Sequence, residues 1–150
     1  MLYEIEPHHG IGPVKLGMSR AEVKVLFGSE NYCNTNGEID FYLESSLQIE
    51  FVDNKADFIG VFYCPDHTVS YKGMNVFDTE AKKLFEFIAL GESCNHEYNT
   101  AEYLFPDQII SLWEADKQYD YIGSHKRLIR GQIGLGTQDY LKAINALIPG

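Results

Sequence analysis

The fold is decided by the stretch Leu47-Gln-Ile-Glu-Phe-Val-Asp-Asn-Lys-Ala-Asp-Phe-Ile-Gly-Val-Phe-Tyr63. Its first half alternates apolar and polar side chains, which is the period of a β-strand with one buried face. A polar turn follows at residues 53–55, and an aromatic and β-branched run comes after it. This order predicts a β-hairpin. Because strand side chains alternate, Gln48 and Glu50 are expected to point away from the core that Leu47 faces.

The same pattern returns 63 residues further along the chain. Over 14 ungapped positions, residues 47–60 and 110–123 share four identities. Self-similarity at a fixed spacing is typical of an internal duplication. The alignment places Trp113 at the position of Glu50, and we therefore expect both on the same face of the sheet.

Three short helices are predicted, each where an extended segment reaches a glycine and then a polar capping residue. Ser19 and Glu22 form a capping box at the start of the first helix, residues 19–27. Asn75 is the expected cap of the second helix and Thr137 that of the third. Apolar residues recur at helical spacing after each of these caps.

Together these elements predict an α+β fold, with one domain over residues 1–150. Two pseudo-repeats, about 13–70 and 71–132, are expected before a closing helix at 137–148. Each unit is a helix followed by about three antiparallel strands. Two such units side by side can form one sheet with the helices on one face, which leaves the opposite face open.

The chain is strongly acidic, with 22 acidic against 12 basic side chains and a formal charge of −10. Residues 28–70 and 86–124 each contain eight acids and one base. A field of this sign repels phosphate backbones and attracts basic partners, so we expect no binding to nucleic acid.

The sequence also indicates a location. The first ten residues lack the pattern of a secretory signal, and no apolar run is long enough to span a bilayer. The three cysteines form no CxxC pair, which suits a reducing compartment. We expect a cytoplasmic protein that does not bind membranes.

The open face of the sheet is predicted to be a protein-docking surface, because Trp and Tyr side chains dominate the binding energy of interfaces. A slip of one residue in register would exchange the two faces and bury Trp113 in the core. That alternative stays open because Phe51 aligns with Glu114, which breaks the alternation in the second copy. The candidate partner-binding residues are Tyr42, Glu50, Asp57, Phe58, Tyr103, Trp113, Asp120 and Tyr121.

Signals for catalysis and for metal binding are weak. None of the five histidines lies in a motif for an activated nucleophile. Cys64-Pro-Asp-His67 resembles half of a metal site, but Cys94-Asn-His96 has a spacing that is unusual for zinc. The sequence therefore predicts no cofactor and no metal site, and it favours binding over catalysis.

The segment Gly12-Pro-Val-Lys-Leu-Gly-Met-Ser-Arg-Ala-Glu-Val-Lys-Val-Leu-Phe-Gly28 is similar to the helix-opening segment of small bacterial BamE/SmpA-like and beta-lactamase-inhibitor-like proteins. The resemblance implies helices on one side of an antiparallel sheet and binding of other proteins through that sheet. This chain departs from those proteins because we find no lipoprotein signal or export sequence in it.

By class, the chain also resembles the acidic immunity proteins that neutralise bacterial toxins. Nuclease toxins are usually basic, and an acidic inhibitor associates with them quickly because the charges steer the encounter. We expect an inhibitory binding protein whose partner is a basic toxin or nuclease domain. The alternatives are a structural or assembly module, and a small-ligand binding domain or hydrolase that uses a His and acid pair.

Overall fold

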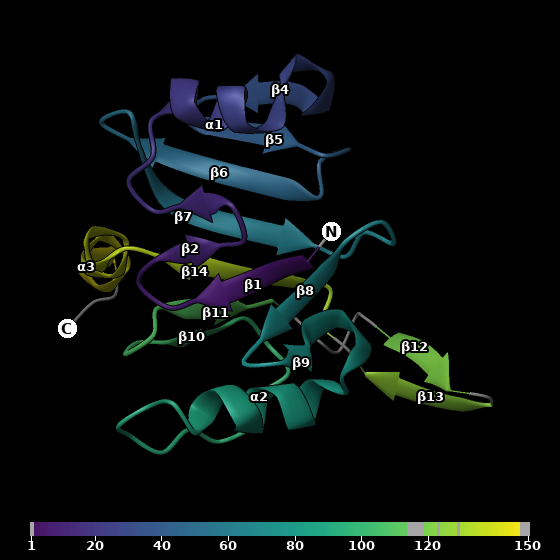
Figure 1. Cartoon of the computed structure of the whole chain (residues 1–150). Helices are drawn as coiled ribbons and strands as arrows, with labels where there is room; N and C mark the ends of the chain where they lie inside the picture. The colour runs from purple at the N-terminus through teal and green to yellow at the C-terminus, as the bar shows by residue number, and fades with distance from the viewer. Residues whose placement is uncertain (1, 114–118, 123, 129, 148–150) are drawn as a thin grey trace.

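The largest part of the structure is an antiparallel sheet, which we call the main sheet (Figure 1). The structure is a computed structural model, and it describes residues 2–113, 119–122, 124–128 and 130–147. The strands of the main sheet lie in the order β10-β11-β14-β7-β6-β5-β4, so β7 and β14 are central. The hairpin expected within residues 47–63 is confirmed, because β6 and β7 pair antiparallel. The strands are β4 (Tyr32–Asn36), β5 (Ile39–Tyr42), β6 (Leu47–Val52), β7 (Lys55–Phe62), β10 (Tyr103–Phe105), β11 (Ile110–Leu112) and β14 (Gln132–Gly136).

A smaller sheet lies against the main sheet. Its order is β3-β2-β1-β8-β9, and β1 and β8 are parallel. Figure 1 shows β1, β2 and β8 crossing in front of the central strands of the main sheet. The α+β class is confirmed, but the strands form separate sheets and not the one sheet that was expected. The strands are β1 (Leu2–Glu6), β2 (Gly10–Ile11), β3 (Val14–Lys15), β8 (Thr68–Tyr71) and β9 (Met74–Asn75).

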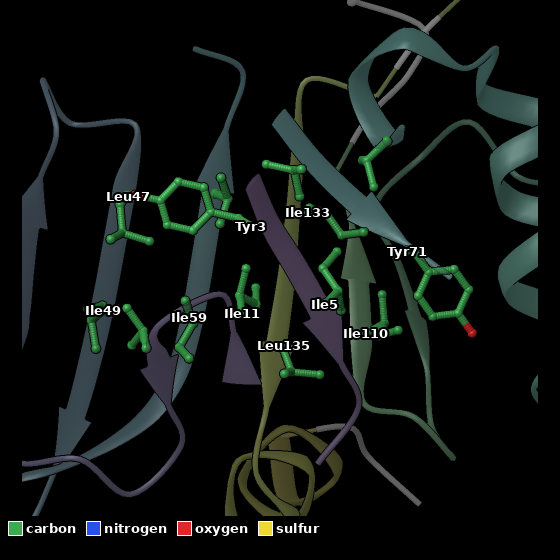
Figure 2. Packing of buried hydrophobic residues seen from close by; sticks show 14 of the residues in the cluster. Tyr3, Ile5, Ile11, Leu47, Ile49, Ile59, Tyr71, Ile110, Ile133 and Leu135 are labelled. Atoms are coloured by element: carbon green, nitrogen blue, oxygen red, sulfur yellow. The ribbon is translucent and has the colours of Figure 1, made fainter. Parts of the chain in front are cut away.

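Buried apolar side chains fill the space between the two sheets, as Figure 2 shows. The face of the main sheet that carries Leu47, Ile49 and Ile59 is called the first face, and Tyr3 and Ile5 of the small sheet pack against it. Its residues are nearly or completely inaccessible, which explains why the first half of the hairpin alternates so clearly. The opposite side is called the second face.

The first two helices also cover the first face. Helix α1 (Arg20–Phe27) begins at the expected capping box, in which Ser19 accepts a hydrogen bond from the Glu22 amide and Glu22 accepts one from the Ser19 amide. A short 3-10 turn (Val76–Asp78), capped by Asn75, precedes α2 (Ala81–Ala89). Both helices bury one apolar stripe in the core shared by the two sheets. A second 3-10 turn (Ser29–Asn31) leads from α1 into β4.

The third helix, α3 (Gln138–Leu147), starts after the predicted cap Thr137, but it contradicts the expectation that all helices share one face. It contacts β7 and β14. Glu50 alternates with Ile49 along β6 and therefore lies on the second face. Phe58 pairs with Glu50 and shares that face, and Tyr140 of α3 stacks on Phe58. The second face is thus partly covered near the start of α3.

The predicted duplication matches the structure only in part and stays a prediction. Leu47 pairs with Val61 and Ile110 pairs with Leu135, so β6 lies beside β7 as β11 lies beside β14. The sequence alignment had instead matched β7 with β12 (Tyr119–Ile122). That strand pairs with β13 (His125–Leu128) in a separate two-stranded hairpin.

No helix among the described residues is long and apolar enough to cross a membrane.

Candidate functional site

Three aromatic side chains meet on the second face and form what we call the aromatic cluster: Phe58, Trp113 and Tyr140. The rings of Phe58 and Tyr140 are stacked, with centroids 4.7 Å apart. Trp113 meets Phe58 edge-on, with centroids 5.8 Å apart. Phe58 is buried at the centre of the cluster, whereas Trp113 and Tyr140 stay partly exposed. Such a cluster offers a rigid apolar contact surface.

Glycines in the central strands make room for the rings. Gly134 lies beside Gly60 across β14 and β7. A Cβ atom on Gly134 would lie 2.1 Å from Cζ of Phe58, and one on Gly136 would lie 2.4 Å from Cδ1 of Tyr140. The rings therefore rest directly on the backbone of β14, as glycine in a strand permits.

An irregularity in β7 links the sheet to α3. Glu50 pairs with Phe58 and Phe51 pairs with Ala56, so Asp57 is an extra residue without a partner on β6, as in a β-bulge. Its carbonyl accepts the Thr137 amide at 3.0 Å, and its Oδ1 accepts the Thr137 hydroxyl at 2.5 Å. The Thr137 hydroxyl in turn accepts the Tyr140 amide. Asp57 thereby fixes where α3 begins and where the Tyr140 ring lies.

Arg130 holds the backbone at Trp113. This arginine is completely buried and its Nη1 donates to the Trp113 carbonyl at 2.8 Å. The same guanidinium donates to the carbonyls of residues 99–101. The Trp113 amide donates to the Gln132 carbonyl at 3.3 Å. The position of Trp113 is thus tied to a neighbouring loop and to β14.

Two carboxylates border the aromatic cluster, and we call Glu50 and Asp57 the carboxylate pair. Burial, and then the charge of Asp57, raises the pKa of Glu50 above its usual range. Burial also raises the pKa of Tyr140, and Glu50 adds to that rise. Among the described side chains, no lysine, arginine or histidine forms an ion pair with either carboxylate. The site is acidic and uncompensated by those residues.

The structure brings together four of the predicted partner-binding residues: Glu50, Asp57, Phe58 and Trp113. Trp113 directly follows Leu112, which faces the core, so alternation directs it to the second face. The slipped register, which would have buried Trp113 in the core, is therefore not the observed one.

The expectation for Tyr42 and Tyr103 is wrong, because both lie on the first face. Tyr42 pairs with Leu47 and Tyr103 with Leu112, and directly paired residues share a face. Tyr42 is completely buried, and burial followed by the charge of Asp40 raises its pKa to about 12. Neither side chain is available to a partner that docks on the second face.

Asp120 and Tyr121 belong to β12 in the separate hairpin, and their side chains lie outside the described residues. Their backbone is paired with β13 and not with the main sheet.

Three residues of the site were not predicted from the sequence: Tyr140, Arg130 and Gly134. Tyr140 follows the predicted cap Thr137, but nothing in the sequence located the closing helix on the second face. One signal was present for Gly134, because Ile133-Gly-Leu resembles Ile59-Gly-Val in the paired central strand. An isolated arginine such as Arg130 carries no comparable signal.

A histidine and acid pair, His96 and Glu92, lies near α2, but its contacts hold neighbouring segments together. His96 Nδ1 is 2.5 Å from the Tyr103 hydroxyl, and Nε2 is 3.5 Å from Oε1 of Glu92 and has no accessible surface. Glu92 also accepts hydrogen bonds from the amides of Asp107 and Gln108. A surface pocket of about 420 Å³ lies alongside, but neither ring nitrogen is presented to it as a free base.

His67 lines a second cavity, and its ring meets Tyr3 edge-on. That cavity holds only about 10 Å³, which is room for a single water molecule at most. Among the described residues, no group of three or more His, Cys, Asp or Glu side chains could hold a metal ion.

Comparison of the chain with protein-family models, with curated proteins and with solved structures finds no match.

Proposed function

We propose that this protein binds a basic protein partner through the second face of its main sheet and thereby inhibits it, as an immunity protein neutralises a toxin. The observation that carries the proposal is the aromatic cluster bordered by the carboxylate pair. A rigid, partly exposed aromatic surface supplies binding energy, and acids at its border select a partner of opposite charge.

The charge of the whole chain supports the same partner class. A formal charge of −10 attracts a basic protein over a distance of about one Debye length and speeds their encounter. Inhibition follows if the docked chain covers the partner's active groove, which in nucleases is basic because it holds a phosphate backbone.

The test begins with recovery of the partner from the source cells by cross-linking, followed by calorimetry with the purified pair. Trp113→Ala should weaken binding by roughly thirtyfold, as expected for an aromatic hot spot. The control is Leu90→Ala, which removes an equally apolar side chain, 81% exposed, at the end of α2. We expect no change in affinity for the control.

Circular dichroism should first establish that Trp113→Ala is folded. Equal affinity of Trp113→Ala and the wild-type chain would contradict docking at this face. Inhibition is tested by adding the chain to its partner at equal concentration and measuring the partner's activity. Binding without any loss of that activity would support an assembly module instead.

A further inference from the structure

The carboxylate pair lies where one partner side chain could touch both acids and the aromatic cluster at once. Glu50 is opposite Phe58 across the two strands, and Asp57 precedes Phe58 at the bulge. Both carboxylates therefore border the ring on which Tyr140 stacks. The partly exposed Trp113 closes another side of the same ring.

Among the described side chains, no lysine, arginine or histidine pairs with either acid. Asp57 uses Oδ1 to accept the Thr137 hydroxyl. Two like charges close together in a half-buried site repel each other and lose hydration, and burial followed by Asp57 is the cause of the raised pKa of Glu50. A cation placed between them would remove both penalties.

The aromatic rings favour one kind of cation. A guanidinium is planar, stacks on aromatic faces and donates hydrogen bonds in more than one direction in its plane. An ammonium is a compact, strongly hydrated charge and loses more hydration in such a place. Cation–π attraction to Trp or Tyr adds to the ion pairs.

We infer that the partner anchors itself with an arginine whose guanidinium lies between Glu50 and Asp57 against the aromatic cluster. This inference rests on the proposed function, since it names the chemistry of the partner at the same site. It also predicts that a short arginine peptide binds the site weakly without the rest of the partner.

The test uses a hexa-arginine peptide, and the fluorescence of Trp113 reports binding because it is the chain's only tryptophan. At low salt, the wild-type chain should show a saturable change in emission. A hexa-citrulline peptide, which keeps the shape but lacks the charge, should give none. The double variant Glu50→Gln/Asp57→Asn should bind hexa-arginine roughly tenfold more weakly.

A matched control separates this site from general attraction to an acidic protein. Glu30→Gln/Glu97→Gln removes two exposed acids elsewhere and changes the net charge equally. It should bind hexa-arginine like the wild-type chain. Equal weakening of both double variants, or an equal response to citrulline, would overturn the inference. Hexa-lysine binding as tight as hexa-arginine binding would overturn the assignment to a guanidinium.

The double variant is designed to fold, because the asparagine that replaces Asp57 keeps a carbonyl oxygen for the Thr137 hydroxyl and glutamine has the shape of glutamate. Thermal unfolding checks this, and Glu50→Gln alone serves if the pair is unstable. If the full partner requires Trp113 but binds the double variant normally, the arginine anchor is wrong and the proposed function stands. If the partner does not require Trp113, the proposed function itself fails.

Discussion

At the scale of single residues, Gly134 makes room for the aromatic cluster because it has no side chain. Gly134→Ala places a Cβ 2.1 Å from Phe58, so the buried ring must move and its contacts with Trp113 and Tyr140 must change. We expect a loss of roughly 2–3 kcal/mol in the free energy of unfolding. Chemical denaturation measures this loss, and the emission of Trp113 should shift in the folded variant.

Gly60→Ala is the matched control, since the two glycines face each other across the central strands. Its Cβ would lie 3.0 Å from Cγ of the Gln48 side chain, which can move aside, and 3.3 Å from Cε1 of Phe58, which needs to shift by only a few tenths of an ångström. The expected loss is about 1 kcal/mol or less. Equal losses in the two variants would show that the Phe58 ring does not depend on Gly134.

Glu50 should make stability depend on pH in an identifiable direction. Its pKa is raised in the folded state, so the protonated form is favoured there and ionisation destabilises the fold. In acid, Glu50→Gln and the wild-type chain should have nearly the same free energy of unfolding. As the pH rises from the usual carboxyl range through the raised pKa of Glu50, Glu50→Gln should become the more stable of the two.

Asp107 provides the opposite case, because hydrogen bonds from the Ser93 side chain and amide lower its pKa. It stabilises the fold above its usual pKa, and that stabilisation is lost as the pH falls. Asp107→Asn should therefore be less stable than the wild-type chain at neutral pH, with the difference vanishing in acid. Urea unfolding at a series of pH values measures both variants. The same sign for both would contradict the assigned causes.

The faces of individual residues were predictable only where the pattern is local. Alternation along β6 placed Leu47 and Glu50 on opposite faces, and the structure agrees. The predicted face of Tyr42 was wrong because it depends on which residue of β6 pairs with Tyr42. That register is set by the turn between the strands. The bulge at Asp57 likewise leaves no signal in the sequence around it.

At the scale of elements, the cap of α3 should control the site. Thr137→Ala removes the hydroxyl that bonds Asp57 and the Tyr140 amide. We expect a loss of about 1 kcal/mol in stability, as for other capping residues. Because the Tyr140 ring rests on Phe58, the emission of Trp113 should also change.

Ser19→Ala is the control for this prediction, since it removes the corresponding cap of α1 on the first face. Thermal unfolding should show a similar loss of stability, but Trp113 should keep its emission. A change of emission in both variants would indicate a general loosening of the fold and not a link through α3.

Elements with caps or alternation were predictable, but their arrangement was not. The starts of α1 and α3 follow from Ser19 and Thr137, whose side chains satisfy amides in the first turn. The parallel pairing of β1 with β8 joins segments far apart in the sequence, and no local pattern specifies which strands pair. The apolar stripe of α3 did not reveal which face of the sheet it would meet.

At the scale of the whole molecule, charge and the aromatic cluster should act on different rate constants. Raising NaCl from about 0.05 to about 0.5 M should slow association with the basic partner by roughly tenfold or more, since it screens the net charge. Trp113→Ala should instead speed dissociation, as removal of a contact usually does. Surface plasmon resonance with the purified pair separates the two effects.

Association that is insensitive to salt would contradict steering by the net charge of −10. Faster dissociation of Leu90→Ala, which alters an exposed position at the end of α2, would contradict the assignment of the contact to the second face.

The pairing of β7 with β14 at the centre of the main sheet also limits how early the sheet can form during synthesis. Strand β7 ends at Phe62, and its neighbour β14 begins only at Gln132. On a ribosome that adds roughly 5–20 residues per second, β7 waits several seconds with an open edge. Unpaired strand edges recruit other chains, so the nascent protein is most prone to aggregate in this interval. A ribosome-bound chaperone that shields β7 should therefore raise the yield of folded protein more than one that acts after release.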